Sequence, residues 1–344
     1  MAARIGINGF GRIGRLVFRA VLDSHADELE VVAINDLTDP ATNALLLKYD
    51  SNYGRFSGDV RAESAALVVN GRRVAVLAES DPVKLPWREL GVDLVIESTG
   101  RFTDAERAGV HLHGGASRVI VSAPFKNGGI TLVLGVNEHE YNPTRHRVIS
   151  NASCTTNALA PVAKVLHDRW GIEKGLLTTV HSYTTSQRLL DNVAKNHRAA
   201  RAAALNIVPT TTGATQAVGL VIPELRGRVT GMAFRVPTPT VSVVDFTAVL
   251  GSDVSVASIN AAFREAADGP LRGILAYSDE PLVSMDLKGD SHSAIVSGLD
   301  TLVVGGNLVK VIAWYDNEWG YACRVADLAA FVAGMDRENA RADR

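Results

Sequence analysis

Hydrophobic residues in the first 150 positions gather in short runs, and segments with helical spacing separate them. The apolar runs cover residues 4–8, 29–36, 92–98 and 117–124. Between them, apolar residues recur about every three or four positions, as in helices, over 12–24, 41–49 and 104–115. Strand, helix and strand in this order predict βαβ units. They therefore favour a doubly wound parallel sheet of the Rossmann type in an α/β protein.

A different pattern begins near residue 170. Long runs rich in β-branched residues follow at 175–185, 227–237, 240–250 and 307–316. Helices are predicted near 155–166, 213–222 and 255–267. This pattern favours a second, α+β domain with a mostly antiparallel sheet and helices on one of its faces. The segment 182–206 is polar and aperiodic, and a loop of that length is usually functional or lies at an interface.

Further signals complete the predicted organisation. Asn-Gly at 70–71, between two apolar runs, predicts a β-hairpin over 67–77. An amphipathic helix near 320–333 is expected to pack back on the first domain. We therefore predict a first domain of residues 1–153 plus 317–344 and a second domain of residues 154–316, which contains the loop 182–206.

Composition narrows the class of protein. A chain of 344 residues is longer than one that folds around a single ordinary hydrophobic core, which predicts more than one domain. The net charge of -2 gives no basic surface for nucleic acid, and no apolar run approaches the roughly 18 residues that a membrane span needs. Two cysteines cannot form a disulfide framework and, without a recognisable secretory leader, favour the cytoplasm. No metal site is expected.

A glycine pattern follows the first predicted strand directly. Gly9, Gly11 and Gly14 are spaced as Gly-x-Gly-x-x-Gly and open a predicted helix. Asp36 ends the next strand, about 20 residues further on. The glycines let the backbone approach a pyrophosphate, and the helix N-terminus stabilises its negative charge. Asp36 can accept hydrogen bonds from ribose hydroxyls and repels a 2′-phosphate, so the sequence predicts a dinucleotide site that favours NAD over NADP.

The two cysteines receive different interpretations. Cys154 lies at the start of a predicted helix, next to Ser153 as a candidate N-cap. A helix N-terminus lowers the pKa of a thiol, and its N–H groups can stabilise an oxyanion. Most free cysteines are small buried apolar residues, so the sequence alone leaves both interpretations of Cys154 open. Cys323 lies among apolar residues of the last helix and is interpreted as packing.

Other residues of the second half are candidates for the same site. His181 ends an apolar strand, where its imidazole could serve as a base for a thiol; a structural histidine fits the spacing equally well. Arg235 lies in an apolar run and is expected to meet a carboxylate or a substrate phosphate, because an unpaired buried charge is costly. The segment 209–216 offers hydroxyls and a glycine before a helix, a second candidate anion cradle.

Several long stretches identify a family when they are taken together. They are collinear over nearly the whole chain and include INGFGRIGR, SNASCTTN, TTVHSYT, GMAFRVPTP and WYDNEWGY. On these motifs the chain resembles the glyceraldehyde-3-phosphate dehydrogenases. The resemblance implies oxidation and phosphorylation of D-glyceraldehyde 3-phosphate to 1,3-bisphosphoglycerate, with NAD and inorganic phosphate, by a cytoplasmic homotetramer of glycolysis.

The resemblance also implies roles for individual residues. The Cys154 thiolate attacks the aldehyde, His181 takes the proton and orients the adduct, and phosphate releases the acyl group after hydride transfer. The positions that match cofactor contacts are Gly9, Gly11, Arg12, Ile13, Gly14, Asp36, Ser98, Thr99, Ser122, Asn317 and Tyr321. The positions that match substrate and phosphate contacts are Ser153, Thr155, Thr184, Thr212, Gly213 and Arg235.

The loop 182–206 departs from the family pattern at two positions. Ser186 replaces an acidic residue that holds the substrate-phosphate arginine, and Ala199 replaces an arginine that contacts the attacking phosphate. One hypothesis is partial retention of activity, with Arg198 or Arg201 compensating. A second is a non-phosphorylating dehydrogenase, such as one for erythrose 4-phosphate. A third is a specialised paralogue that resists an electrophilic natural-product inhibitor. An RNA-binding role is not favoured, because the chain has no basic stripe.

Overall fold

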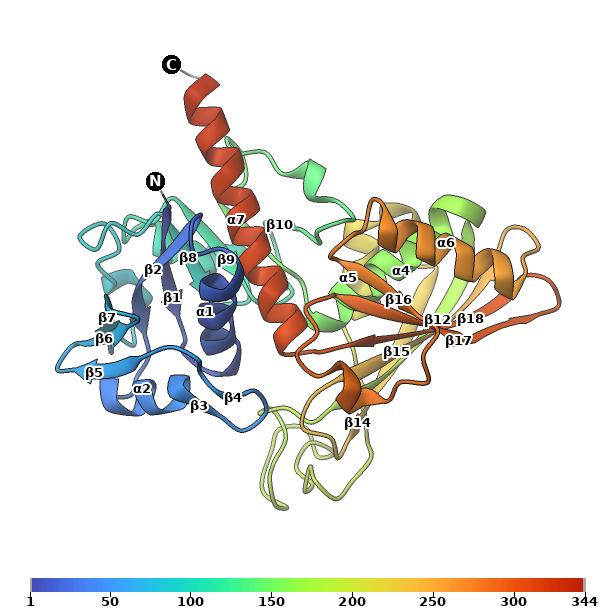
Figure 1. The fold of residues 1–344 in the computed structure, drawn as a ribbon, viewed down its shortest axis with the longest axis horizontal. Helices are drawn as coiled ribbons and strands as arrows, with labels where there is room; N and C mark the ends of the chain where they lie inside the picture. Colours follow the sequence, from blue (N-terminus) through green and yellow to red (C-terminus); the bar gives the residue numbers. More distant parts are fainter. Residues whose placement is uncertain (1, 343–344) are drawn as a thin grey trace. The chain divides into compact units, whose positions relative to one another are not determined.

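The computed structural model describes residues 2–342, and these fall into two compact units. The first unit lies within Met1–Leu132, His139–Ala152 and Ala322–Arg344, and the second comprises Val133–Glu138 and Ser153–Tyr321. Figure 1 labels the elements of both units along the chain. The domain boundaries expected from the sequence stay a prediction.

The strands of the first unit form a mixed sheet with a parallel centre (Figure 1). Its order is β10 (Ile130–Thr131), β11 (Val148–Ser150), β9 (Arg118–Val121), β8 (Leu94–Glu97), β1 (Ala3–Asn8), β2 (Leu29–Asn35), β7 (Arg72–Leu77), β6 (Ala66–Val69) and β5 (Val60–Glu63). The pairs from β10 to β7 are parallel, and β5 and β6 add an antiparallel edge. The Rossmann-type sheet predicted from the sequence is confirmed.

The predicted hairpin is also confirmed, and its turn has a clear physical cause. Asn70 and Gly71, between β6 and β7, have φ values of 50° and 80°. Positive φ at both central residues defines the turn that best fits the twist of paired strands, and Asn-Gly is the sequence that adopts it most readily. A small ribbon of β3 (Tyr49–Asp50) and β4 (Gly54–Arg55) lies elsewhere in this unit.

The helices of the first unit follow the prediction except at one place. They are α1 (Arg12–Ser24), α2 (Pro40–Lys48), α3 (Ala105–Ala108) and, from residue 322 onward, α7 (Trp319–Ala342). The expected helix over 104–115 is wrong in its length, because α3 is one turn that continues as a 3₁₀ helix to Leu112. Glycine is a poor helix former, and Gly115 adopts φ +107°. α7 packs on this unit as expected, since Arg118 of β9 donates to Asp336 at 2.8 Å.

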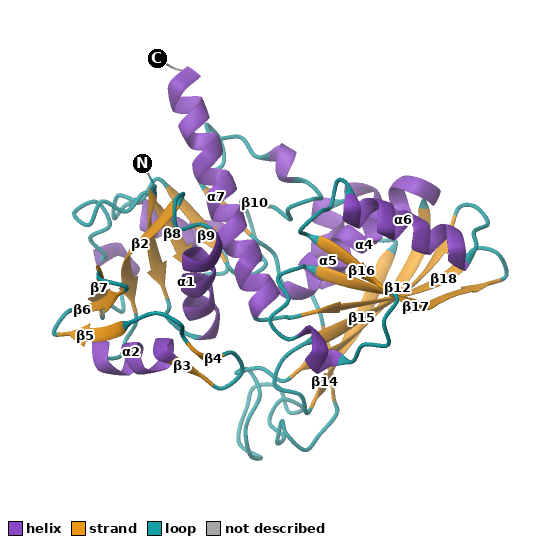
Figure 2. Ribbon diagram, in the orientation of Figure 1, coloured by secondary structure: helices purple, strands orange, loops and turns teal. Residues whose placement is uncertain are grey.

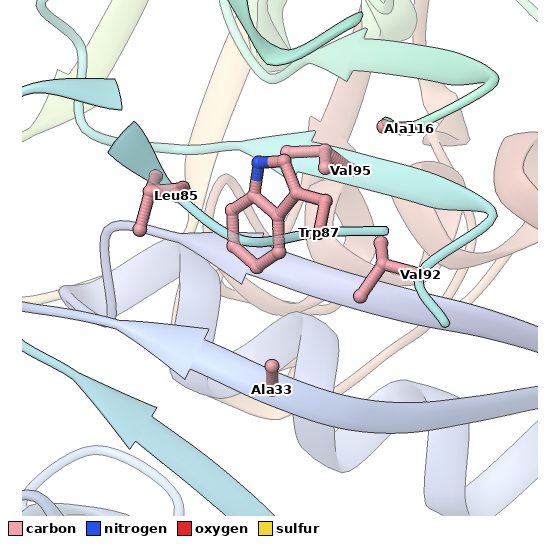
Figure 3. Close-up of a cluster of buried hydrophobic side chains, with 6 residues drawn as sticks. All are labelled: Ala33, Leu85, Trp87, Val92, Val95 and Ala116. Atoms are coloured by element: carbon pink, nitrogen blue, oxygen red, sulfur yellow. The ribbon is translucent and has the colours of Figure 1, made fainter. Parts of the chain in front are cut away.

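Trp87 is the largest fully buried side chain in one of the hydrophobic clusters of this unit. Figure 3 shows the indole among its neighbours Ala33, Leu85, Val92, Val95 and Ala116. The surroundings are close-packed, because a Cβ placed on Gly6 would lie only 2.8 Å from the ring. The indole therefore has little freedom to move.

The second unit is a sheet covered by helices, and Figure 2 shows the two kinds of element. The strand order is β13 (Val208–Thr211), β14 (Val229–Val236), β12 (Ile172–Ser182), β15 (Ser242–Leu250), β18 (Leu308–Tyr315), β17 (Ala294–Val304) and β16 (Leu275–Ser278). Most pairs are antiparallel, as predicted, but β12–β14 and β16–β17 are parallel. The strands β16 and β17 were not predicted.

Within residues 2–342, three helices pack on this sheet: α4 (Cys154–Trp170), α5 (Ala214–Val221) and α6 (Val256–Asp268). Short 3₁₀ turns occur in both units at Pro82–Lys84, Gly109–Leu112, Glu138–Glu140, Pro223–Leu225 and Ser284–Leu287. The segment between β12 and β13, which includes 183–207, contains no helix or strand, as the sequence predicts for 182–206.

The parallel pairing of β12 with β14 sets the geometry of the second unit. Its register places His181 opposite Arg235 and Leu177 opposite Gly231. A Cβ on Gly231 would lie 2.2 Å from the Leu177 carbonyl oxygen, which is backbone and cannot move aside alone. Gly231 therefore permits the approach of the two strands.

We expect Gly231→Ala to destabilise the fold by about 1–3 kcal/mol or more, because it overpacks a backbone contact. Urea unfolding monitored by circular dichroism measures the change. Gly109→Ala is the matched control: a Cβ there would meet Val148 at 3.7 Å, an ordinary contact, and should change the stability by less than about 1 kcal/mol. Equal stability of the two variants would contradict the close approach at Gly231.

Candidate active site

Cys154 is the first residue of α4, as predicted. Ser153 is the N-cap, and its hydroxyl accepts a hydrogen bond from the Thr156 N–H at 3.0 Å. Ala152, just before the cap, has a φ of 54°, a strained conformation for a residue with a Cβ. Cys154 forms no disulfide, and the residue as a whole is partly exposed. The capped helix start therefore presents a sulfur atom beside N–H groups that have no partner within the helix.

His181 lies at the end of β12 and faces this thiol. Its Nε2 is 3.6 Å from Cys154 Sγ, and the imidazole is 5% exposed. Its Nδ1 lies 2.7 Å from the Ser182 carbonyl oxygen. A carbonyl can only accept, so this contact favours a proton on Nδ1. With the proton on Nδ1, Nε2 has a lone pair directed at the thiol, which is the arrangement that a general base needs.

Arg235, on β14, lies beside the imidazole of His181. Its Nη1 donates to the Ser182 carbonyl oxygen at 3.0 Å and lies 2.5 Å from His181 Nδ1. A guanidinium can only donate, so this second contact favours an acceptor at Nδ1, whereas the Ser182 carbonyl favours a proton there. With either tautomer, the charge of Arg235 opposes a positive charge on the ring. Burial, with Arg235 as the second cause, lowers the pKa of His181 to about 3.

The thiol is also uncharged in this arrangement. Burial raises the pKa of Cys154, and the opposing effect of the Arg235 charge is smaller. The direction is opposite to that expected from the helix N-terminus alone, because desolvation outweighs it. At neutral pH the site is therefore a neutral thiol facing a neutral imidazole, and the proton moves when the sulfur atom attacks.

Arg235 itself has no carboxylate partner within ion-pair distance among residues 2–342. Burial lowers its pKa from the ordinary value, yet a guanidinium stays charged at any physiological pH. Of the two anions expected from the sequence, an internal carboxylate is therefore not found in the described part of the chain. The arrangement favours an external anion.

Tyr315 contacts two of the predicted site residues, Thr155 and His181, although nothing in the sequence had singled it out. Its hydroxyl lies 2.9 Å from both Thr155 Oγ1 and Thr179 Oγ1, and its ring packs edge-on against His181. The Thr155 hydroxyl, a predicted phosphate contact, is thus directed to Tyr315 in this structure. Tyr315 ends an alternating strand, a pattern that predicts a core residue and carries no sign of a role at a site.

Asn317 has a fixed amide orientation. The hydroxyls of Ser182 and Ser242 both donate to its Oδ1, at 2.9 and 2.8 Å. Ser242 Oγ also accepts from the Ser182 N–H at 3.0 Å, so its own proton is available to Asn317. The Asn317 Nδ2 group is consequently the donor that this residue presents. Tyr321, in the first turn of α7, is buried in the same unit.

The predicted phosphate positions lie in the loop after β12 and at the start of α5. Thr184 Oγ1 is 2.9 Å from Ser186 Oγ, so the serine partners a threonine where an acid was expected. Thr212 Oγ1 accepts from the Ala214 N–H at 3.2 Å, and Gly213 is the N-cap of α5. A Cβ on Gly213 would have no atom nearer than 4.0 Å, so this helix start is open.

Among the arginines that could replace the missing one, Arg201 is already engaged. Its Nε donates to Asp191 at 2.8 Å on the surface of the loop. Arg198 reaches the Pro209 carbonyl oxygen of β13 through a long contact of 3.5 Å. Arg198 is therefore the better candidate for compensating Ala199.

The first unit holds the glycine fingerprint in the conformation it predicts. Gly9 has φ +91°, and a Cβ on Gly14 would lie 2.1 Å from the Gly9 carbonyl oxygen. Both positions therefore need glycine, one for the turn and one for close packing of α1 on β1. Asp36 accepts a hydrogen bond from the Phe10 N–H at 2.8 Å, which joins the end of β2 to the glycine loop.

A pocket of about 280 Å³ opens beside this loop. Its lining includes the predicted residues Gly9, Gly11, Asp36, Ser98 and Thr99. Other predicted cofactor positions lie outside that lining: Arg12, Ile13 and Gly14 are in the first turn of α1, and Ser122 follows β9. Arg12 is ion-paired with Asp50. The sequence analysis missed Glu79 and Arg101, which also line the pocket.

Within 2–342, no group of three or more His, Cys, Asp or Glu side chains is arranged to hold a metal ion. None of the helices described in the same range combines the length and apolar character needed to cross a membrane.

Comparison with known proteins agrees with both units. Residues 3–105 match the family described as glyceraldehyde 3-phosphate dehydrogenase, NAD binding domain, and residues 153–317 match its C-terminal domain. The glyceraldehyde-3-phosphate dehydrogenase of Geobacillus stearothermophilus is 59% identical, over 97% of this chain and 99% of that protein. Glyceraldehyde-3-phosphate dehydrogenase 1 of Bacillus subtilis (strain 168) is 56% identical over the same shares. This chain therefore belongs to the glyceraldehyde-3-phosphate dehydrogenase family.

Proposed function

We propose that this protein oxidises D-glyceraldehyde 3-phosphate to 1,3-bisphosphoglycerate with NAD and inorganic phosphate, in glycolysis. The observation that carries the proposal is the contact of 3.6 Å between Cys154 Sγ and His181 Nε2. It joins a nucleophile at a helix N-terminus to an imidazole that can serve as its base, which are the parts that covalent catalysis on an aldehyde needs. Membership of the family supplies the substrate class.

In the first step, Cys154 Sγ attacks the aldehyde carbon as His181 Nε2 accepts the thiol proton. The N–H groups at the start of α4 stabilise the oxygen of the resulting thiohemiacetal. His181 returns this proton to the alkoxide oxygen, which gives the thiohemiacetal hydroxyl and restores the neutral imidazole that burial and Arg235 favour. The neutral imidazole accepts the hydroxyl proton again as the hydride leaves the same carbon atom. NAD, when bound, supplies the hydride acceptor that leaves Cys154 as a thioester.

The anions of the reaction have separate candidate positions in the second unit. Arg235 and Thr184 hold the phosphate of the substrate, and Arg235 suits this role because no carboxylate in the described chain neutralises it. Ser153, Thr155, Thr212 and Gly213 surround the attacking phosphate. NAD is held by Asn317 and Tyr321 at its nicotinamide end and by Gly9, Gly11, Arg12, Ile13, Gly14, Asp36, Ser98, Thr99 and Ser122 along the rest.

A homotetramer in the cytoplasm completes the proposal. Large apolar side chains stay exposed on the strands of the second unit, where Leu176 is 61%, Leu302 55% and Val304 63% exposed. In the loop 182–206, Leu189 and Val193 are 80% and 88% exposed. These exposed apolar side chains support contacts with further copies of the chain.

We expect Cys154→Ser to lower NADH formation from glyceraldehyde 3-phosphate at least about a thousandfold, because a serine hydroxyl is a far weaker nucleophile at neutral pH. Cys323→Ser is the matched control and should keep at least half of the activity. Absorbance of NADH at steady state measures both. Retention of activity by Cys154→Ser would remove the covalent mechanism.

The lowered pKa of His181 predicts a pH effect on stability. The unfolded imidazole takes up a proton below its ordinary pKa of about 6.5, whereas the folded one stays neutral down to about 3. The unfolded state therefore binds more protons in this window, so the free energy of unfolding decreases as the pH is lowered, by about 1.6 kcal/mol between pH 6.5 and 5.

Urea unfolding at these two pH values tests this effect. His181→Gln should show a smaller loss of stability at the lower pH than the parent protein does. His113→Gln, at an exposed site, should keep the loss of the parent protein. An undiminished loss in His181→Gln would show that this imidazole is not held neutral in the folded protein.

Restoring charge at Ala199 tests the phosphorylating reaction against the alternative oxidation of erythrose 4-phosphate. Ala199→Arg should lower the KM for inorganic phosphate by about ten- to a hundredfold, because a charge-assisted hydrogen bond is regained. Ala204→Arg adds the same charge at an exposed position of the loop and should leave this KM unchanged.

Initial rates with both aldehydes at varied inorganic phosphate give the answer. Strict dependence on phosphate with glyceraldehyde 3-phosphate is the expected result for the parent protein. Phosphate-independent turnover that is faster with erythrose 4-phosphate would instead support the non-phosphorylating activity.

A further inference from the structure

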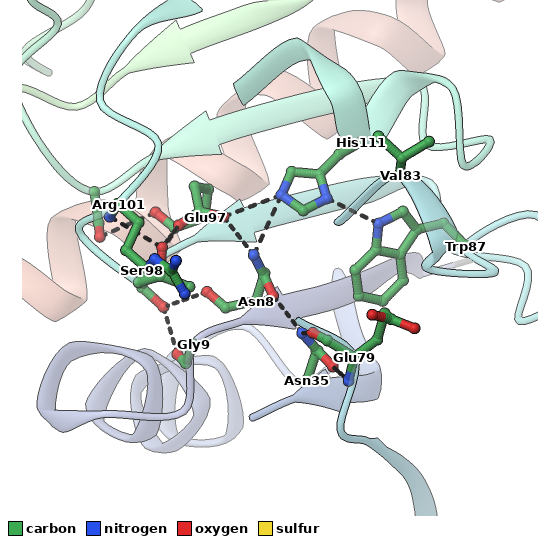
Figure 4. Close-up of polar contacts among 12 residues, drawn as sticks. Asn8, Gly9, Asn35, Glu79, Val83, Trp87, Glu97, Ser98, Arg101 and His111 are labelled. Atoms are coloured by element: carbon green, nitrogen blue, oxygen red, sulfur yellow. Dashed lines mark hydrogen bonds and ion pairs between the residues drawn. The ribbon is translucent and has the colours of Figure 1, made fainter. Parts of the chain in front are cut away.

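Glu97, at the end of β8, is a buried carboxylate that plays no part in the proposed chemistry. Its side chain is 1% exposed. No lysine or arginine forms an ion pair with it among residues 2–342, and its partners are neutral donors (Figure 4). A buried charge of this kind is tolerated only if hydrogen bonds satisfy both of its oxygens. The donors that do so come from separate segments of the first unit.

The first oxygen of Glu97 organises the loop that follows its own strand. Oε1 accepts from the Thr99 N–H at 2.8 Å and from the Thr99 hydroxyl at 2.5 Å. The Thr99 hydroxyl oxygen in turn accepts from the Arg101 N–H at 3.1 Å. The carboxylate therefore fixes the backbone of residues 98–101, and three of these four residues line the nucleotide pocket.

The second oxygen of Glu97 receives the side chains of Asn8 and His111. Asn8 Nδ2 donates to Oε2 at 2.5 Å, and His111 Nε2 lies 3.0 Å from the same atom. The indole N–H of Trp87 points at His111 Nδ1, at 3.1 Å, and can only donate. His111 Nδ1 is thus the acceptor and Nε2 the donor, so the ring is neutral. Figure 4 shows this chain from Trp87 to Glu97.

The network continues from Asn8 to further strand ends. Asn8 Oδ1 accepts from Asn35 Nδ2 at 2.7 Å, and Asn35 Oδ1 accepts from the Glu79 N–H at 2.9 Å (Figure 4). Asn8 ends β1, Asn35 ends β2, and Glu79 follows β7. Through these bonds, one carboxylate connects the carboxyl ends of four strands, which is the edge where ligands bind in such sheets.

The connected loops also contact each other directly at the glycine turn. Ser98 Oγ donates to the Gly9 carbonyl oxygen at 2.6 Å. A Cβ on Gly9 would lie 2.7 Å from the Thr99 nitrogen, so the two backbones pack without space between them. A shift of Thr99 would therefore move the turn that approaches the pyrophosphate.

We propose that Glu97 is a positioning residue for the dinucleotide, and that His111 holds it in place. The pair fixes the loops after β1 and β8 in the binding conformation before the adenosine diphosphate part of the cofactor arrives. Trp87 anchors the other end of this hydrogen-bonded chain, and Figure 3 shows its indole enclosed in the hydrophobic cluster. This inference rests on the proposed use of NAD. Glu97 acts through Thr99 and Asn8, because it is buried.

Glu97→Gln tests the proposal with nearly the same side-chain shape. In either orientation its amide group would direct an N–H at donors, either at Thr99 N–H or at Asn8 and His111. We expect the apo protein, titrated calorimetrically, to bind NAD and ADP-ribose about 10- to 100-fold more weakly than the parent protein. The kcat at saturating NAD should change less than about threefold, because the reacting groups are untouched.

A pair of variants at His111 separates positioning from mere packing. His111→Gln can keep both a donor to Glu97 and an acceptor for Trp87, whereas His111→Phe fills the space and loses both. We expect His111→Gln to bind ADP-ribose within about threefold of the parent protein, and His111→Phe to resemble Glu97→Gln. This comparison decides the matter also if Glu97→Gln does not fold.

The outcomes also separate this inference from the proposed function. If the parent protein binds neither NAD nor ADP-ribose, the proposed function fails. If the parent protein binds both ligands, and His111→Gln and His111→Phe bind ADP-ribose equally well, the positioning role is wrong and the proposed function stands. A loss of kcat in Glu97→Gln with unchanged ADP-ribose affinity would also overturn the positioning role.

Discussion

The parallel pairing of β12 with β14 is the constraint on which the candidate active site depends. Its register sets His181 beside Arg235, so an imidazole and a permanent cation occupy neighbouring positions on adjacent strands. Burial and this cation together keep the imidazole neutral, and its Nε2 faces Cys154 Sγ. If β14 were shifted by one residue against β12, Arg235 would turn to the opposite face and would no longer lie beside His181.

Local pattern predicted most of the fold. The alternation of apolar runs and helical segments indicated the Rossmann sheet, and Asn70-Gly71 indicated the hairpin, because these signals are carried by neighbouring residues. The errors have physical causes as well. Glycines shortened the expected helix after residue 104. The strands β16 and β17 went unpredicted, and β12–β14 is parallel inside a mostly antiparallel sheet, an arrangement that tertiary pairing decides.

The candidate site was predictable in part for the same reason. Cys154 stood out through its place at a helix start, and the glycine loop through its spacing, but the bare spacing of His181 left its role open. Ser242, Tyr315 and Glu97 gave no local signal, because their importance comes from partners far away in the sequence. A serine in an alternating strand or a glutamate at a strand end is ordinary until the fold brings its partner near.

Ser182 has every one of its hydrogen-bonding groups engaged. Its N–H donates to Ser242, its carbonyl oxygen accepts from Arg235 and lies 2.7 Å from His181 Nδ1, and its hydroxyl donates to Asn317. Under the proposed function, Ser182 therefore supports both the imidazole proposed as the base and the amide proposed to hold the nicotinamide. A displacement of Ser182 would alter the alignment of both side chains at once.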